Sequence, residues 1–148
     1  MTLGLCMIVK DEEEVLGRCL SSARGVFDEI NIVDTGSHDA TKQIAAKYTG
    51  RIFDYAWNFD FAAARNFSFS RATTDYIMWL DADDVLPESS RKALIALKNR
   101  PDFGDTDAYF LRYDAAFDAD GNPTFYFYRE RILRRSCNFR WKGAVHET

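Results

Sequence analysis

The sequence lacks any long hydrophobic run, and its purely apolar stretches are only a few residues long. A membrane-spanning helix needs about 20 mostly apolar residues, so the chain is not expected to cross a bilayer. The apolar start at residues 3–9 runs directly into the charged residues Lys10 to Glu14. It lacks the basic flank and cleavage site of a signal peptide. The sequence therefore predicts a cytoplasmic protein.

Paired cysteines, excess positive charge and glycine-rich loops are also missing. The three cysteines, Cys6, Cys19 and Cys137, have neither a disulfide framework nor a metal-site spacing, and we interpret them as reduced residues of the core. A net charge of -4 and an isoelectric point of about 5.2 argue against a nucleic-acid-binding protein. Neither G-x-G-x-x-G nor G-x-x-x-x-G-K-[ST] occurs, which argues against a dinucleotide-binding Rossmann domain and a P-loop enzyme.

Apolar side chains are plentiful. The 148 residues are 47% hydrophobic and 15% aromatic, which predicts one folded domain over residues 1–148. Apolar segments typical of strands alternate with segments of helical periodicity. We expect strands at 3–9, 29–34, 51–55 and 75–80, and helices at 12–22, 40–48, 61–71 and 88–98. Ser37 or Asp39 is expected to cap the second helix and Asp60 the third.

The last third of the chain has a different pattern. Segments 107–113 and 124–128 flank the turn-rich residues 118–123, which predicts an antiparallel pair of strands. Ile132-Leu133 is expected to form a further short strand. The whole pattern predicts an α/β fold with a mostly parallel sheet, helices on both faces, and antiparallel strands in the C-terminal third.

Polar residues follow three of the predicted parallel strands, at the edge of the sheet where ligands bind in such folds. The most informative group is Asp81-Ala82-Asp83-Asp84, which follows a strongly apolar strand. Asp81 and Asp83 are two residues apart and point to the same side of an extended segment. Their repulsion is relieved by a divalent cation such as Mg²⁺ or Mn²⁺. The alternative is an acidic cap before the helix that Pro87 opens.

Three further polar residues are candidates for ligand binding. Asp34 ends the second strand and can accept hydrogen bonds from a ribose or a base, although a plain strand-to-helix turn is the alternative. Arg65 and Asn66 are polar residues in an otherwise apolar helix. Arg65 could hold a phosphate or pair with one of the aspartates. We expect most of the aromatic residues around them to belong to the core; these are Trp57, Phe59, Phe61, Phe67 and Phe69.

Charge is unevenly distributed along the second half of the chain. Residues 75–88 hold five acidic and no basic residues, whereas residues 129–142 hold six basic residues and one acidic residue. This suggests a cation site followed by an anion-binding segment, with two solvated faces as the alternative.

His146-Glu147 supplies a possible metal ligand and a possible general base, with a frayed polar end as the alternative.

Together these motifs resemble family 2 glycosyltransferases, which have the Rossmann-like GT-A fold. The resemblance extends over nearly the whole chain and rests on motifs in family order: Leu5-Cys6-Met7-Ile8-Val9-Lys10-Asp11-Glu12-Glu13, Ile32-Val33-Asp34-Thr35-Gly36-Ser37-His38-Asp39-Ala40-Thr41, Ala64-Arg65-Asn66, Trp79-Leu80-Asp81-Ala82-Asp83-Asp84 and Val145-His146-Glu147. It is strongest to a bacterial branch in which helical repeats often follow this domain.

The resemblance implies transfer of a sugar from a UDP-linked donor to an acceptor hydroxyl, with inversion. The acceptor would be a glycan, a lipid-linked sugar or a protein. By analogy, Asp34 and Glu12 bind the nucleoside, Arg65 lies near the phosphates, and Asp81 contacts the ribose or the ion. By the same analogy, Asp83 and His146 would bind Mn²⁺ or Mg²⁺, and Glu147 would be the catalytic base.

Family domains of this kind are usually longer, so we expect the chain to be truncated at its C-terminal end, with weak or no activity in isolation. Two other classes of protein stay open. One is a non-catalytic module that binds a nucleotide-sugar or a glycan. The other is a nucleotidyltransferase, although the basic or glycine-rich phosphate loop that such an enzyme carries near its first strand is not present.

Overall fold

The computed structural model describes all 148 residues and contains one six-stranded sheet in the order β3-β2-β1-β4-β6-β5. The strands are β1 (Leu3–Val9), β2 (Glu29–Asp34), β3 (Ile52–Asp54), β4 (Tyr76–Trp79), β5 (Ala108–Phe117) and β6 (Pro123–Arg134). The first four are parallel, whereas β6 is antiparallel to both β4 and β5. The predicted mostly parallel sheet with antiparallel strands in the last third is therefore confirmed.

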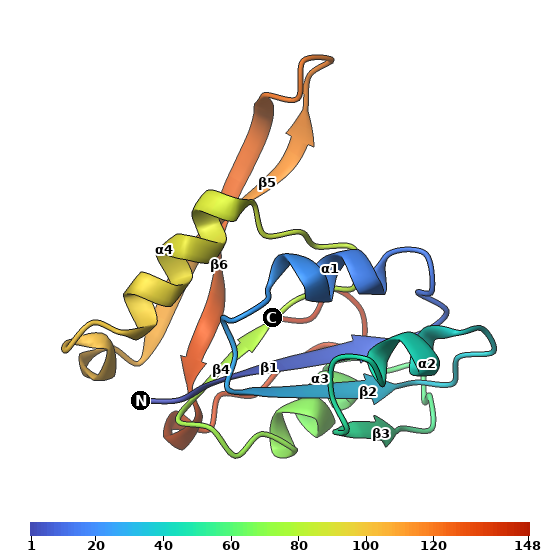
Figure 1. The fold of residues 1–148 in the computed structure, drawn as a ribbon. Helices are drawn as coiled ribbons and strands as arrows, with labels where there is room; N and C mark the ends of the chain where they lie inside the picture. The colour runs from blue at the N-terminus through green and yellow to red at the C-terminus, as the bar shows by residue number, and fades with distance from the viewer.

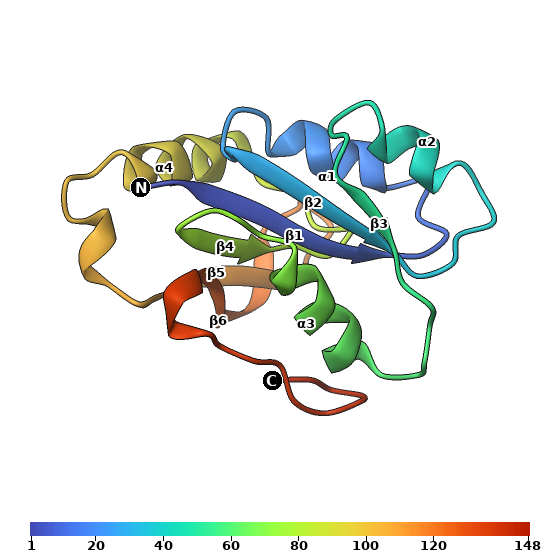
Figure 2. The same cartoon turned by 90° about the horizontal axis from the view of Figure 1, so that it is seen from below.

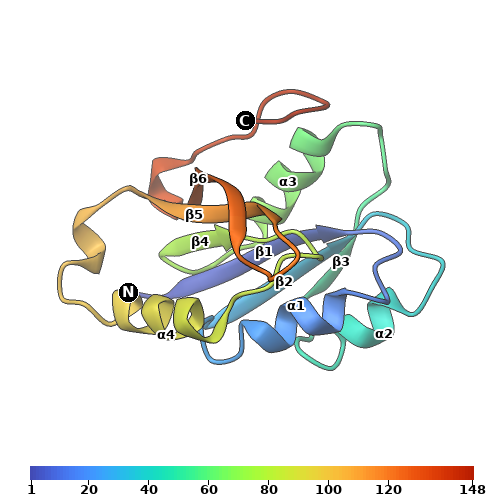
Figure 3. The ribbon, with the colours of Figure 1, turned by 90° about the horizontal axis from the view of Figure 1, so that it is seen from above.

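Helices cover both faces of the sheet, as predicted. Figures 2 and 3 show α1 (Leu16–Ser22), α2 (Thr41–Ala45) and α4 (Glu88–Lys98) on one face, and α3 (Phe61–Ser70) with the C-terminal segment on the other. Alternation along β1 explains the two cores. Leu5 and Met7 pack into the larger core with α1, whereas Cys6 packs into a smaller core beneath α3 that contains Trp79 and Trp141.

The β5–β6 hairpin extends well beyond the parallel strands (Figure 1). The expectation of a separate strand at Ile132-Leu133 is wrong, because both residues belong to β6, which continues unbroken from the hairpin into the sheet. Ile132 pairs with Met78 of β4 and with Tyr109 of β5. The hairpin thus joins directly to the strand that carries the aspartate cluster.

The first two helices are shorter than predicted, α1 at its start and α2 mainly at its end. Glu13 accepts from the backbone amide of Ala40 at 2.9 Å, and α1 begins only at Leu16. Neither Ser37 nor Asp39 occupies the N-cap of α2, which is Ala40 without a side-chain cap. The expected cap of α3 is confirmed, since Asp60 accepts from the amide of Ala63 at 2.9 Å.

Candidate active site

The carboxyl ends of β1, β2 and β4 lie at one edge of the sheet, since Val9 is in register with Asp34 and Cys6 with Trp79. A cavity of about 430 Å³ opens there. That volume falls within the usual range for small-ligand sites. The aromatic residues Trp57 and Phe61 line it. Its charged lining consists of five residues that follow predicted strands or were predicted as site residues: Lys10, Glu12, Arg65, Asp81 and Asp83.

Asp34 is buried behind this cavity, and its neighbour Thr35 lines the wall. One carboxylate oxygen accepts hydrogen bonds from the amides of Gly36 and Ser37, both at 2.9 Å, which holds the turn after β2. Gly36 has φ +110°, a conformation that favours glycine. The other oxygen, Oδ2, is buried without a partner. An orphaned buried acceptor is costly in a native structure, so a donor from a ligand would satisfy Asp34.

The Asp81–Asp84 segment forms a turn in which the carboxylates have different surroundings. Asp83 is exposed, Asp84 is buried, and Asp81 lies between these extremes. Asp81 accepts from Arg65 at 2.8 Å. Asp84 forms a buried ion pair with Arg131 at 2.9 Å and also accepts from the amide of Asp81. Asp83 therefore remains as the carboxylate of this turn that has no cationic side chain bound to it.

Arg65 joins two of the predicted site residues. Its guanidinium donates to Asp81 at 2.8 Å and to Glu147 at 2.6 Å, with only 9% of its side chain exposed. The guanidinium carbon also lies 4.9 Å from the Trp79 ring and 5.2 Å from the Trp141 ring. Burial alone would lower the pKa of Arg65, but the charge of Asp81 and the bonds to both carboxylates raise it above its ordinary value.

The C-terminal segment is held against α3 and is not a frayed end (Figure 3). Asn66 donates to the carbonyl of Trp141 and accepts from its amide, both at 2.9 Å. Lys142 and Thr148 exchange two backbone hydrogen bonds, and the carbonyl of Ala144 accepts from the first amide of α3. These bonds place Glu147 beside Arg65, and they give Asn66 a role that the sequence did not reveal.

A second cavity of about 360 Å³ adjoins the first, since Phe61, Arg65 and Asp81 line both. His146 and Glu147 line this second cavity, whereas Asp83 lines the first. The two predicted metal ligands, Asp83 and His146, are therefore not brought together. No group of three or more His, Cys, Asp or Glu side chains in the chain could hold a metal ion.

The first cavity nevertheless has a strongly acidic rim. The pKa of Glu12 is raised above its ordinary value, first by partial burial and then by the charges of Asp83, Asp39 and Asp81. Mg²⁺ commonly takes one or two protein carboxylates and completes its coordination shell with water and phosphate oxygens. The donor set around Asp83 fits a cation bound in this way, together with a phosphorylated ligand.

A comparison with known families decides between the classes of protein that use such a site. The profile described as "Glycosyl transferase family 2" matches residues 5–147, nearly the whole chain. The chain belongs to glycosyltransferase family 2. This confirms the resemblance inferred from the motifs.

Relatives and solved structures agree with the family. A TPR repeat-containing protein of Synechococcus elongatus is 34% identical over 98% of this chain and 34% of its own length. The prophage-derived glycosyltransferase SunS of Bacillus subtilis is 26% identical over 99% of this chain and 34% of its own. The chain thus spans about a third of the length of these curated relatives.

Among solved structures, TarS 1–349 of Staphylococcus aureus in complex with UDP superposes with a TM-score of 0.67 at 17% identity, covering 96% of this chain and 50% of TarS. Glucosyl-3-phosphoglycerate synthase of Mycobacterium tuberculosis, in complex with Mn²⁺ and UDP-glucose, gives 0.51 at 20% identity, covering 58% and 34%. These likenesses confirm the GT-A fold. No helix of this chain has the length and apolar character needed to traverse a bilayer.

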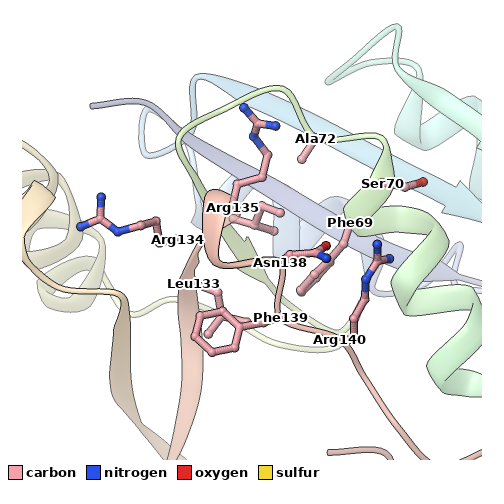
Figure 4. A pocket seen from close by; sticks show the side chains of 10 residues that line it. Phe69, Ser70, Ala72, Leu133, Arg134, Arg135, Asn138, Phe139 and Arg140 are labelled. Atoms are coloured by element: carbon pink, nitrogen blue, oxygen red, sulfur yellow. The ribbon is translucent and has the colours of Figure 1, made fainter.

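The side chains of the basic segment, residues 129–142, bond mainly within the protein. Arg131 pairs with Asp84, and Arg134 pairs with Asp107 at 2.7 Å. Arg135 donates to the carbonyl of Thr74. These last two arginines border a hollow of about 170 Å³ near the end of β6, where Figure 4 shows them pointing apart. Only Arg129 of the segment lines the second active-site cavity.

Several residues were misjudged from the sequence. Trp57 and Phe61 line the first cavity, and Phe59 is 81% exposed, so the expectation that these aromatic residues are core is wrong for them. Of the five aromatic residues that were expected in the core, only Phe69 is buried. Phe59 also has φ +62°, an unusual conformation for a bulky residue. Cys137 is exposed and is not a core cysteine, whereas Cys6 and Cys19 are buried as expected.

Proposed function

We propose that this chain is the donor-binding part of a glycosyltransferase that moves a sugar from a UDP-linked donor to an acceptor hydroxyl with inversion. The observation that carries the proposal is the arrangement around Arg65, which bonds both to Asp81, shared by the two cavities, and to Glu147 of the second cavity. The neighbours that bind UDP or UDP-sugars share this fold, which supports the same class of donor here.

In this proposal the nucleoside occupies the first cavity. The unpartnered oxygen of Asp34 accepts a hydrogen bond from the uracil base, and Glu12 lies near the nucleoside. Trp57 offers an aromatic surface on the same wall. Arg65 and His146 contact the diphosphate, because both line the adjoining cavity. A guanidinium is well suited to bind phosphate oxygens through parallel hydrogen bonds.

Asp83 and Asp81 would hold Mg²⁺ or Mn²⁺, Asp83 directly and Asp81 through water. When bound, the ion supplies positive charge that stabilises the leaving diphosphate. Glu147 accepts the proton of the acceptor hydroxyl. The hydroxyl oxygen then bonds to the anomeric carbon as the bond from that carbon to the diphosphate oxygen breaks. Arg65 donates to Glu147 at 2.6 Å and so fixes the position of the carboxylate that acts as the base.

Calorimetric titration with UDP, with and without Mn²⁺, tests the donor site. We expect Mn²⁺ to strengthen UDP binding to the native chain and Asp83→Asn to abolish that enhancement, because the ion loses its exposed carboxylate. Asp114→Asn is a matched control on the hairpin, where Asp114 pairs with Arg112. An absence of UDP binding, or an enhancement that survives Asp83→Asn, would refute the proposed metal-assisted donor site.

A non-catalytic nucleotide-sugar-binding module is the second candidate, favoured by the ion pair that occupies Glu147. Hydrolysis of UDP-sugars separates the two. A transferase is expected to release sugar slowly to water and to lose this activity in Glu147→Gln while it still binds UDP. UDP binding by the native chain without any hydrolysis or transfer would favour the binding module.

A further inference from the structure

A buried ion pair adjoins the aspartate turn. Arg131 of β6 donates to Asp84 at 2.9 Å and to the carbonyl of Trp79 at 3.2 Å. The exposed fractions of the two side chains are 6% for Arg131 and 8% for Asp84. Neither residue lines the two cavities around Arg65. The pair is therefore close to the site without facing the ligand.

The carboxylate of Asp84 forms a hydrogen bond within the Asp81–Asp84 turn. Its Oδ2 atom accepts from the amide of Asp81 at 2.9 Å, and the amide of Asp84 donates to the carbonyl of Asp81 at 3.0 Å. The same Oδ2 atom accepts from Arg131. One oxygen thus links the turn to β6, and the exposed residue between the two bonded ends is Asp83.

Arg131 is itself fixed by an aromatic residue. Its guanidinium carbon lies 3.9 Å from the centre of the Trp79 ring, and Arg65 lies 4.9 Å from the same ring. Trp79 donates in turn to the carbonyl of Glu130. The arginine that binds Asp81 and the arginine that binds Asp84 therefore share one indole. Stacking of this kind orients a guanidinium as well as attracting it.

A buried ion pair contributes little net stability, because both charges lose their hydration. Net stability therefore does not explain the pair, whereas its geometry suggests a role. We propose that Arg131 is a positioning residue, which fixes the Asp81–Asp84 turn through Asp84 and so presents Asp83 to a divalent cation bound with the donor diphosphate. This inference rests on the proposed function of the cavity.

The test compares Arg131→Met with Arg131→Lys, and uses Arg134→Met as the matched control. Arg134 is on the same strand, and it pairs with Asp107 away from the turn. Mn²⁺ binding is followed by electron paramagnetic resonance and UDP affinity by calorimetry, with circular dichroism to report the fold. We expect Arg131→Met to lose about tenfold or more of the Mn²⁺ enhancement, the effect usual for residues that orient metal ligands. UDP affinity without metal should stay unchanged.

Arg131→Lys should recover part of the enhancement, and Arg134→Met should keep it all. A folded Arg131→Met chain with the full enhancement would overturn the inference. If Arg131→Met does not fold, Asp84→Asn decides, because its amide oxygen can still accept from Asp81 while the charge is gone. Asp84→Asn with native enhancement overturns the positioning role, and so does failure of both variants to fold, which would make the pair purely structural.

Failure of the underlying function would look different. If the native chain shows no Mn²⁺-dependent UDP binding, the proposed donor site is wrong and the positioning role is lost with it. If the native chain shows that dependence while the Arg131 and Asp84 variants keep it, the donor site stands and only the inference falls.

Discussion

The parallel part of the sheet and the C-terminal third use aromatic and charged side chains in opposite ways. In β1 and β4 nearly every side chain is buried, and the acidic residues lie just beyond the carboxyl ends of these strands. In the β5–β6 hairpin the large aromatic side chains Phe110, Phe117, Phe125, Tyr126 and Tyr128 are exposed, whereas Arg131 is buried. The parallel part thus forms the core and the cavity floor.

The two parts are joined by reciprocal ion pairs. The parallel part supplies Arg65 to Glu147 of the C-terminal segment, and the hairpin supplies Arg131 to Asp84. Each part therefore contributes one arginine and one carboxylate to these two ion pairs. The parallel part lines the first cavity by itself, whereas the second cavity is assembled where the two parts meet.

The largest expected effect is from Arg65→Met. The substitution leaves the mostly buried carboxylate of Glu147 without its cation and releases Asp81. Breaking such a pair from one side costs about 3 kcal/mol of unfolding free energy. Urea denaturation measures it, with Arg100→Met as control, since the pair of Arg100 with Asp102 is exposed and contributes little to stability. Equal losses in both variants would show that the two parts are not coupled through Arg65.

Core and hairpin positions should differ in the cost of truncation. Leu5 of β1 is fully buried, so Leu5→Ala is expected to lose about 3 kcal/mol. Tyr128 is 61% exposed, so Tyr128→Ser should change stability by less than about 0.5 kcal/mol. Thermal denaturation of both variants provides the comparison. A loss of stability in Tyr128→Ser close to that in Leu5→Ala would mean that the aromatic side chains of the hairpin are buried in solution, contrary to their exposure in the structure.

Asn66→Ala tests how the C-terminal segment is attached. Both backbone groups of Trp141 lose their partner, which should cost about 2 kcal/mol and speed tryptic cleavage after Lys142. Asn122→Ala is the matched control, because Asn122 bonds through its side chain only within an exposed turn. Unchanged proteolysis of Asn66→Ala would contradict the idea that α3 holds this segment.

The smallest effect concerns the thiols. Burial raises the pKa of Cys6 and of Cys19 from 9.0 to about 12. In the unfolded chain these thiols ionise near pH 9, so their contribution to stability is present below that pH and declines as the pH rises toward 12. At about pH 10 the loss is about 1 kcal/mol per thiol.

Urea denaturation at about pH 8 and about pH 10 should therefore show a smaller alkaline loss in Cys19→Ala than in the native chain. In the native chain an aromatic disulfide reagent should label the exposed Cys137 alone. Rapid labelling of three thiols at neutral pH would show that the parallel core opens far more readily than its burial implies.

Much of the parallel part was predictable from local patterns. Apolar runs marked β1, β2 and β4, and the turn chemistry at Asp60 marked the start of α3. Because parallel strands end at a common edge, the same patterns also predicted that Glu12, Asp81 and Asp83 share a cavity. The C-terminal third was harder, since Arg129, Glu130 and Arg131 interrupt the apolar pattern of β6 and conceal its continuity.

The sequence by itself determined the family, the alternation of strands and helices, and the presence of carboxylates at strand ends, because each is set by residues close together in the chain. Only the tertiary structure decided the partners of the two arginines. Arg65 meets Glu147 across 82 residues, and Arg131 meets Asp84 across 47. No local pattern encodes such a contact, since it depends on how β6 and the C-terminal segment pack against β4 and α3.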